Sequence, residues 1–139
     1  MKSLIICDDL SLLNMMNPRS FYLKESLFLV PRANLKNKLT KKGMNSLSGS
    51  LIKSSIYKRA DLKDIDIIII LLEDSTSIEN ILKALFKVIK DIPVVAHLRK
   101  TDSPVSKKYP RVKFIPIPSM FNNFLFYEIR GIMIKKMIF

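Results

Sequence analysis

A run of six apolar residues, IIIILL at positions 67–72, limits the fold of this chain more than any other feature. A strand with one face in water alternates apolar and polar residues, whereas this run is apolar on both faces. Four of its residues are isoleucines, whose β-branched side chains favour an extended backbone. We therefore predict a central strand over Ile65–Leu72, in a parallel sheet that is covered on both sides.

Shorter apolar runs and helical patterns alternate along the rest of the chain. The clearest helical pattern spans Ser77–Lys90, where apolar residues recur at spacings of three and four. Because strands that alternate with helices form parallel sheets through crossover connections, the pattern predicts an α/β fold, a three-layer sandwich whose mostly parallel sheet has about six strands. The other predicted strands are Leu4–Cys7, Leu27–Val30, Pro93–Leu98 and Lys113–Ile117, with a weaker candidate at Met44–Ser48.

The basic residues are unevenly distributed. The chain of 139 residues has a formal net charge of +12, and residues 26–60 contain eight basic side chains and no acidic one. Such a segment predicts a surface that attracts an acidic partner or an anionic membrane. Nucleic acid is the less favoured partner, because Phe and Tyr are not interleaved with the basic residues in 32–60 as base stacking requires. The eight residues are Arg32, Lys36, Lys38, Lys41, Lys42, Lys53, Lys58 and Arg59.

Cysteine content and hydropathy predict the compartment. The single cysteine, Cys7, cannot form an internal disulfide and fits a reducing environment. The sequence has no uncharged apolar run of about 20 residues that would span a membrane, and Met1 is not followed by the apolar core of a signal peptide. We expect a cytoplasmic location, with peripheral attachment at the inner membrane face as an alternative.

Two pairs of carboxylates follow the first and fourth predicted strands, at Cys7-Asp8-Asp9 and Leu72-Glu73-Asp74. In dinucleotide-binding sheets the ligand lies between these two strand ends, where a turn rich in glycine cradles the phosphates. Asp8 or Asp9 would instead cap the next helix through its free amides, and we favour this interpretation. The alternative is a site for a divalent cation formed by the four carboxylates, Asp8, Asp9, Glu73 and Asp74.

An ordered set of short motifs runs through the middle of the chain. A predicted helix ends in Gly43, and Gly49-Ser50 follows it. Ala60-Asp61 and Asp64-Ile65-Asp66 precede the isoleucine strand, Glu73-Asp74 follows that strand, and the next strand ends in Arg99. This set resembles the N-terminal nucleotide-binding domain of the RCK family, the regulators of potassium conductance, also called TrkA N-terminal domains. The resemblance implies a Rossmann-like fold over residues 1–118, binding of a dinucleotide or adenine nucleotide, and a membrane channel or transporter subunit as partner.

The residues that would bind the nucleotide depart from the family pattern. The glycine-rich turn falls on Cys7, Asp9 and Leu12, the acid that holds the ribose falls on Pro31 beside Arg32, and the aspartate of the glycine-aspartate pair is Ser50. We therefore predict no cofactor, or NAD or ATP bound only weakly, and a non-enzymatic regulatory or assembly subunit. The positions that the resemblance assigns to this degenerate site are Cys7, Asp8, Asp9, Leu10, Arg32, Ser50, Leu72, Glu73 and Arg99.

Catalytic residue types are scarce, which also favours a non-enzymatic protein. The only histidine, His97, lies within a predicted strand, and two acids beside Cys7 would raise the pKa of its thiol. We find no arrangement of a serine with a base, no P-loop and no metal motif. Two alternatives remain: a nucleic-acid-binding protein that uses the basic surface, and a regulator that binds a divalent cation or another anionic ligand between the first and fourth strands.

The C-terminal segment, residues 119–139, is predicted to be an apolar helix. Thirteen of its 21 residues are apolar, which is more than one stripe packed on a sheet requires. Its two asparagines and four charged side chains make a membrane span unfavourable. We therefore expect the spare apolar face, including Phe124, Ile132 and Phe139, to be covered by a second copy of the chain in a homodimer.

Overall fold

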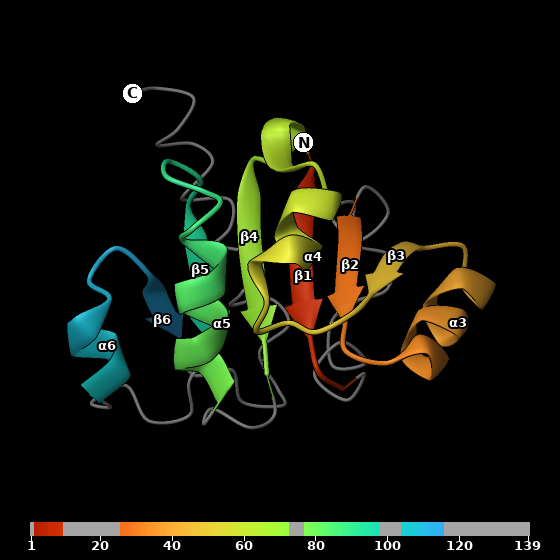
Figure 1. The fold of residues 1–139 in the computed structure, drawn as a ribbon, viewed down its shortest axis with the longest axis horizontal. Helices are drawn as coiled ribbons and strands as arrows, with labels where there is room; N and C mark the ends of the chain where they lie inside the picture. Colours follow the sequence, from red (N-terminus) through yellow and green to blue (C-terminus); the bar gives the residue numbers. More distant parts are fainter. Residues whose placement is uncertain (1, 10–25, 73–76, 98–103, 116–139) are drawn as a thin grey trace.

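The computed structural model describes residues 2–9, 26–72, 77–97 and 104–115. Its strands form one six-stranded sheet in the order β3-β2-β1-β4-β5-β6, in which every neighbouring pair is parallel (Figure 1). The predicted Rossmann-like α/β fold is therefore confirmed, with a sheet that is parallel throughout the described strands. The strands are β1 (Ser3–Cys7), β2 (Ser26–Val30), β3 (Asn45–Ser48), β4 (Ile67–Leu71), β5 (Val94–His97) and β6 (Lys113–Ile115).

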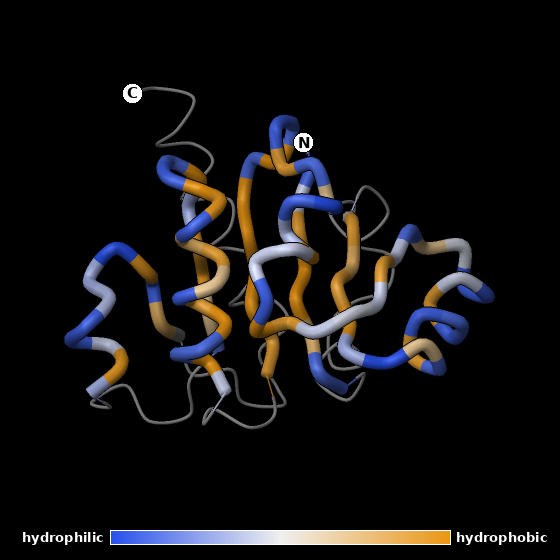
Figure 2. The backbone as a smooth tube through the Cα atoms, in the orientation of Figure 1, coloured by the Kyte–Doolittle hydropathy of each residue, from blue (hydrophilic) through white to orange (hydrophobic). Residues whose placement is uncertain are grey.

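The isoleucine run forms β4, which lies between β1 and β5. All five of its residues are buried, so the prediction of a central strand covered on both faces is confirmed. Figure 2 shows this strand as hydrophobic along its length. The strand starts at Ile67 rather than at Ile65, because Leu62–Asp64 form a short 3-10 helix, η1, and the Ile65 amide still bonds to the Leu62 carbonyl at 3.2 Å.

One face of the sheet carries α4 (Ser54–Arg59) and α5 (Ile78–Leu85), which lie in front of the sheet in Figure 1. Parallel register places one row of side chains across all six strands on this face. Every member of the row belongs to, or packs against, the apolar cluster that also contains the buried residues of α4 and α5. The row is Leu47, Leu29, Ile6, Ile70, Ala96 and Phe114.

The alternate row of side chains faces the other way and includes Phe28 and Ser46. Helix α3 (Ala33–Lys41) lies on this second face, because the Ser46 hydroxyl donates a hydrogen bond to its Lys36 carbonyl at 3.3 Å. Its two buried residues, Leu35 and Leu39, point inward, while most of the helix is hydrophilic (Figure 2). Helices thus cover both faces, as the predicted three-layer sandwich requires.

Helix α3 ends in a glycine at the position that the sequence predicted. The Gly43 amide bonds to the Thr40 carbonyl and the Met44 amide to the Leu39 carbonyl, each at 3.0 Å. This pair of bonds is the Schellman motif, which needs a residue in left-handed backbone conformation. Gly43 supplies it with a φ of 78°, without the steric cost that a Cβ would bring.

The helix predicted over Ser77–Lys90 is shorter in the structure, and α5 ends at Leu85. Beyond that point the Val88 amide bonds to the Leu85 carbonyl three residues back, so the chain tightens into a turn. Ile89 is nevertheless 4% exposed. The apolar spacing therefore predicted the buried positions correctly except for Phe86, which is half-buried, and it predicted too long a helix.

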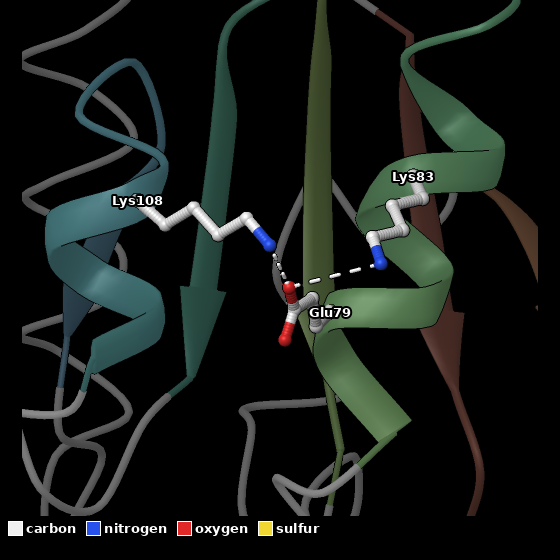
Figure 3. A network of polar contacts seen from close by, with 3 residues as sticks. All are labelled: Glu79, Lys83 and Lys108. Atoms are coloured by element: carbon white, nitrogen blue, oxygen red, sulfur yellow. Dashed lines mark hydrogen bonds and ion pairs between the residues drawn. The ribbon is translucent and has the colours of Figure 1, made fainter.

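Polar and aromatic contacts tie α5 to α6 (Pro104–Lys108) and to the turn that follows it. The Glu79 carboxylate forms an ion pair with Lys108, and a longer one, at 3.9 Å, with Lys83 one turn along α5 (Figure 3). Near the end of α5, the Phe86 ring stacks on Tyr109 with centroids 6.0 Å apart, and the Arg111 guanidinium lies 5.2 Å from the Phe86 centroid. These contacts hold α6 and the turn after it against α5.

Several predictions concern residues that the structure does not describe. The proposed C-terminal helix, with Phe124, Ile132 and Phe139, lies outside the described residues, as do the helix expected after Asp9 and the division of the chain at residue 118. In the part of the chain that is described, no helix is long and apolar enough to cross a membrane.

Candidate functional site

The carboxyl ends of β1 and β4 mark the point where the strand order reverses. From β1 the chain adds β2 and β3 on one side, and from β4 it adds β5 and β6 on the other. Cys7, the last residue of β1, lies opposite Leu71, the last residue of β4. Open α/β sheets bind ligands in the crevice beyond such a point. The strand order confirms that it lies between the first and fourth strands.

Exposure increases along the segment that leaves β1. Cys7 is fully buried, Asp8 is half-buried and Asp9 is exposed. Burial, and then the nearby charges of Asp8 and Asp9, raise the pKa of the Cys7 thiol to about 12. The predicted effect of the two acids on this thiol is thus confirmed in direction, although burial is the larger cause. A thiol with this pKa stays protonated at neutral pH and is a poor nucleophile.

The two carboxylates give this turn the wrong charge for a pyrophosphate. In nucleotide-binding sheets, glycines let the backbone approach the phosphates and leave the helix amides free for them. Here side chains stand at 7–9, and two of the three are acidic. Two like charges 4 Å apart repel by about 1 kcal/mol in water and by about 4 kcal/mol near a protein surface, and a diphosphate carries several charges.

The end of β4 is described only in part. Leu72, which follows the strand, is 1% exposed and packs in the core. Glu73 and Asp74 lie outside the described residues, so the proposed convergence of Asp8, Asp9, Glu73 and Asp74 on a cation stays a prediction. Within 2–9, 26–72, 77–97 and 104–115, no three histidine, cysteine or acidic residues are grouped so that they could hold a metal ion.

The ends of β2 and β3 bring Arg32 and Ser50 to the same edge of the sheet as Cys7, because all the strands are parallel. Both residues are exposed. Arg32 precedes α3, where its carbonyl accepts a hydrogen bond from the Lys36 amide at 3.3 Å and its side chain makes no capping bond. The Ser50 carbonyl accepts a bond from the Lys53 amide at 3.2 Å. Leu10 and Arg99, the other two positions that the resemblance assigned, lie outside the described residues.

Gly49 packs closely against α4. Its amide donates a hydrogen bond to the Val30 carbonyl at 3.1 Å, which joins the ends of β2 and β3. A Cβ at this position would lie 3.1 Å from Ile56 Cδ1 and 3.8 Å from Arg59 Nη1. The Arg59 guanidinium therefore lies beside the loop after β3, although Arg59 ends α4. The sequence did not predict that Arg59 lies near this loop, because the contact depends on how far the Arg59 side chain extends toward the start of α4.

His97 ends β5 and is 3% exposed. Its placement within a strand is therefore confirmed. Being buried, its imidazole is poorly placed to exchange protons with a ligand in solution.

A cleft of about 530 Å³ lies at the opposite edge of the sheet, between η1 and the turn after α5. Its floor includes Tyr57, Leu62 and Ile89, and its rim carries three lysines and two aspartates. Ligands of this fold class bind at the carboxyl ends of the strands, so this amino-end cleft is not the candidate site. The rim residues are Lys58, Lys63, Lys90, Asp61 and Asp91.

The fold and the edge at β1 and β4 define the chain as a Rossmann-like α/β domain. A solved structure with this fold is the NAD(P)-binding domain of an exopolyphosphatase-related protein from Archaeoglobus fulgidus, which matches with a TM-score of 0.70 over 93% of this chain and 97% of that one. The two sequences are 15% identical, so the likeness establishes the fold alone. No protein-family model matches the sequence, and neither does any curated protein.

Proposed function

We propose that this chain is a non-enzymatic regulatory or assembly subunit of an ion-transport system, in which the nucleotide site of a Rossmann-like domain is lost or altered. The observation that carries the proposal is the segment Cys7-Asp8-Asp9 at the end of β1. It places a buried side chain and two carboxylates where a nucleotide-binding sheet has its glycine turn. The assignment to ion transport rests on the resemblance of the motifs to the RCK family.

The chemistry of the described residues supports a role without catalysis. The Cys7 thiol is buried and its pKa is raised to about 12, and the only histidine, His97, is 3% exposed. Nucleophilic and general acid–base catalysis need such groups in contact with substrate and with a pKa near the working pH. A regulatory domain needs neither, because it acts through binding and contact with partners.

Titration calorimetry with NAD, NADH and ATP tests the loss of the site. We expect none of the three to bind the full chain with low-micromolar affinity, because Asp8 and Asp9 repel a diphosphate and the turn has no glycine. The variant Asp9→Gly removes a negative charge and a side chain, so that phosphates can approach the backbone. It should therefore bind these nucleotides more tightly than the native chain does. Tight binding of any of these nucleotides by the native chain would refute the proposal.

A matched variant separates the site from general electrostatics. Asp91 is exposed at the amino edge of the sheet, before β5, and Asp91→Gly makes the same change in residue and charge. We expect it to leave nucleotide affinity unchanged. An equal gain in both variants would show that net charge, and not the turn after β1, limits binding.

A further inference from the structure

A hollow of about 320 Å³ lies between the end of α5 and the turn after α6. Its lining residues precede β5 and β6, so it lies at the amino edge of the sheet. Among the described residues that form this lining, none is acidic. We call it the aromatic hollow. Its lining includes two aromatic and three basic side chains, which are Phe86, Tyr109, Lys90, Lys108 and Arg111.

Arg111 is held in a defined orientation at this hollow. Its guanidinium lies 5.2 Å from the centroid of the Phe86 ring, and its Nη2 donates a hydrogen bond to the Ile92 carbonyl at 3.3 Å. The Phe86 ring in turn stacks on Tyr109, with centroids 6.0 Å apart and planes 23° apart. Arg111 is nevertheless exposed, while both aromatic residues are half-buried. The planar guanidinium is therefore oriented before a ligand arrives, which reduces the entropy lost on binding.

The charge of the aromatic hollow comes mainly from Arg111 and Lys90. The third cation, Lys108, forms an ion pair with the Glu79 carboxylate on α5 (Figure 3). Lys90 is exposed. The acid that follows it, Asp91, lines the neighbouring cleft and not this hollow. A ligand in the hollow therefore meets two cations beside two aromatic rings.

We infer that the aromatic hollow binds single-stranded nucleic acid. Proteins bind single strands through aromatic and arginine side chains on which bases stack, and through cations that contact the phosphates. Both kinds of group line this hollow. The more basic segment 32–60 has one aromatic residue, Tyr57, and it is fully buried. The hollow lies at the opposite edge from the turn at Asp8 and Asp9, so the inference does not depend on whether a dinucleotide binds beyond β1 and β4.

The space around the hollow suits a strand better than a mononucleotide. The cleft of about 530 Å³ at the same edge shares Ile89 and Lys90 with it, so the two cavities are neighbours. The rim of the cleft has three lysines and two aspartates, which add little net charge but leave room for further nucleotides. Proteins that bind single strands through stacking cover about 4–16 nucleotides in such open sites.

Other partners fit the aromatic hollow less well. Duplex DNA keeps its bases stacked inside the double helix, so the rings and the guanidinium would find no base face to stack on. An anionic membrane needs apolar side chains that project outward, whereas Phe86 and Tyr109 are half-buried and Ile89 is 4% exposed. Lysine is depleted at the centres of protein interfaces, and two lysines line this hollow.

Fluorescence anisotropy with a labelled single strand of twelve thymidines tests the inference on the full chain. We expect binding that weakens as salt is raised, because phosphate contacts release condensed counterions. A strand of the same length without bases has the same charges and nothing to stack, so it should bind at least about fivefold more weakly. Thymidine monophosphate and a duplex of the same length should also bind more weakly than the single strand.

Variants at the hollow separate stacking from charge. Tyr109→Leu removes one ring and should weaken binding about fivefold or more, whereas Tyr109→Phe should bind as the native chain does. Arg111→Lys keeps the charge but loses the planar guanidinium, so it should also bind more weakly. Lys90→Gln should reduce the slope of log affinity against log salt by about 0.7, the value for one phosphate contact.

The matched control is Lys38→Gln, which removes one exposed cation from α3, the helix beside β3 at the other end of the sheet. It should leave both the affinity and the salt slope unchanged, and circular dichroism verifies that each variant is folded. The inference is overturned if the native chain does not bind the single strand at low salt, or if the strand without bases, the duplex or the monophosphate binds as tightly. It is also overturned if folded Tyr109→Leu and Arg111→Lys bind as the native chain does, or if Lys38→Gln loses as much as Lys90→Gln.

Discussion

The Tyr57 hydroxyl donates a hydrogen bond to the backbone carbonyl of Leu51, with 2.5 Å between the two oxygens. Both residues are buried in the cluster between α4 and the sheet. The bond joins the loop before α4 to the helix itself. The N-cap residue of α4, Lys53, makes no side-chain capping bond. Burial raises the pKa of the Tyr57 phenol above its usual range, so the hydroxyl remains a donor at neutral pH. Together with the hydrogen bond from the Lys53 amide to the Ser50 carbonyl, this contact positions the segment that carries Ile52.

Removing this hydroxyl should destabilise the fold. Tyr57→Phe keeps the ring but leaves the buried Leu51 carbonyl without this donor, which costs about 1–3 kcal/mol. Urea denaturation followed by circular dichroism measures the loss. Tyr109→Phe is the control, because it preserves the ring that stacks on Phe86 and Tyr109 is only half-buried. Equal stability of the two variants would mean that the Tyr57 bond contributes little.

Gly49 should not tolerate a methyl group. In Gly49→Ala the new Cβ lies 3.1 Å from Ile56 Cδ1, so the isoleucine must move within a packed core, at a cost of about 1 kcal/mol or more. Ile56→Val removes that methyl. We therefore expect the cost of Gly49→Ala to fall in the Ile56→Val background, a positive coupling that a double-mutant cycle of denaturation midpoints detects.

The same substitution at Gly43 provides the contrast. Nothing lies within 4 Å of a Cβ placed there. A side chain at this position would therefore cost stability only because the φ of 78° is unfavourable for residues other than glycine. Gly43→Ala should destabilise by about 1 kcal/mol, Gly43→Asn by less, and Ile56→Val should alter neither value. Rescue of Gly43→Ala by Ile56→Val would show that the coupling at Gly49 is not a local steric effect.

Patterns that repeat over several residues predicted the fold well. The isoleucine run predicted the central strand, and the alternation of elements predicted the parallel sheet, because both signals are summed over many side chains. Even the weak candidate at Met44–Ser48 became β3, although two of its four residues are serines. Its strand is specified by pairing with β2 rather than by its own hydropathy.

Features that depend on a single side chain or on tertiary contacts were not predictable. The helix was predicted to end at Lys90, whereas α5 ends at Leu85, because Phe86 and Ile89 continue the apolar spacing in a turn instead of a helix. At the candidate site, residue types predicted the acidic turn at Asp8 and Asp9. No sequence signal predicted that Arg59 reaches the loop at Gly49, since that contact is set by the packing of α4.

The oligomeric state is a separate prediction. We expect two copies of the chain to form a homodimer through the apolar segment 119–139. Sedimentation velocity of the full chain at micromolar concentration measures its oligomeric state. Ile132→Asp places a charge on the predicted apolar face and should give monomers or aggregates. Lys135→Asp, a charge change at a residue predicted to be polar, should leave the dimer intact. A monomeric native chain would contradict the prediction.

The buried thiol of Cys7 should make the protein less stable in alkali. Its pKa rises from the ordinary value of 9.0 to about 12, mainly through burial, so between these values the unfolded chain releases a proton that the folded chain retains. The stability is therefore complete below pH 9 and decreases above it, with a slope that approaches about 1.4 kcal/mol per pH unit for this group. Tyr57 adds a similar effect, which develops mainly above its ordinary pKa of 10.0, so the thiol contributes more than the phenol between pH 9 and 10.

Urea denaturation across that interval, on the native chain and on Cys7→Ala, measures the contribution. We expect the alanine variant to have a lower stability at pH 7, because it leaves a small cavity at the end of β1. Its stability should nevertheless fall less steeply between pH 9 and 10, by up to one proton per molecule. A thiol reagent should react slowly with the folded native chain at pH 8 and rapidly once urea unfolds it. Identical pH slopes for the two proteins would contradict the assignment of a raised pKa to Cys7.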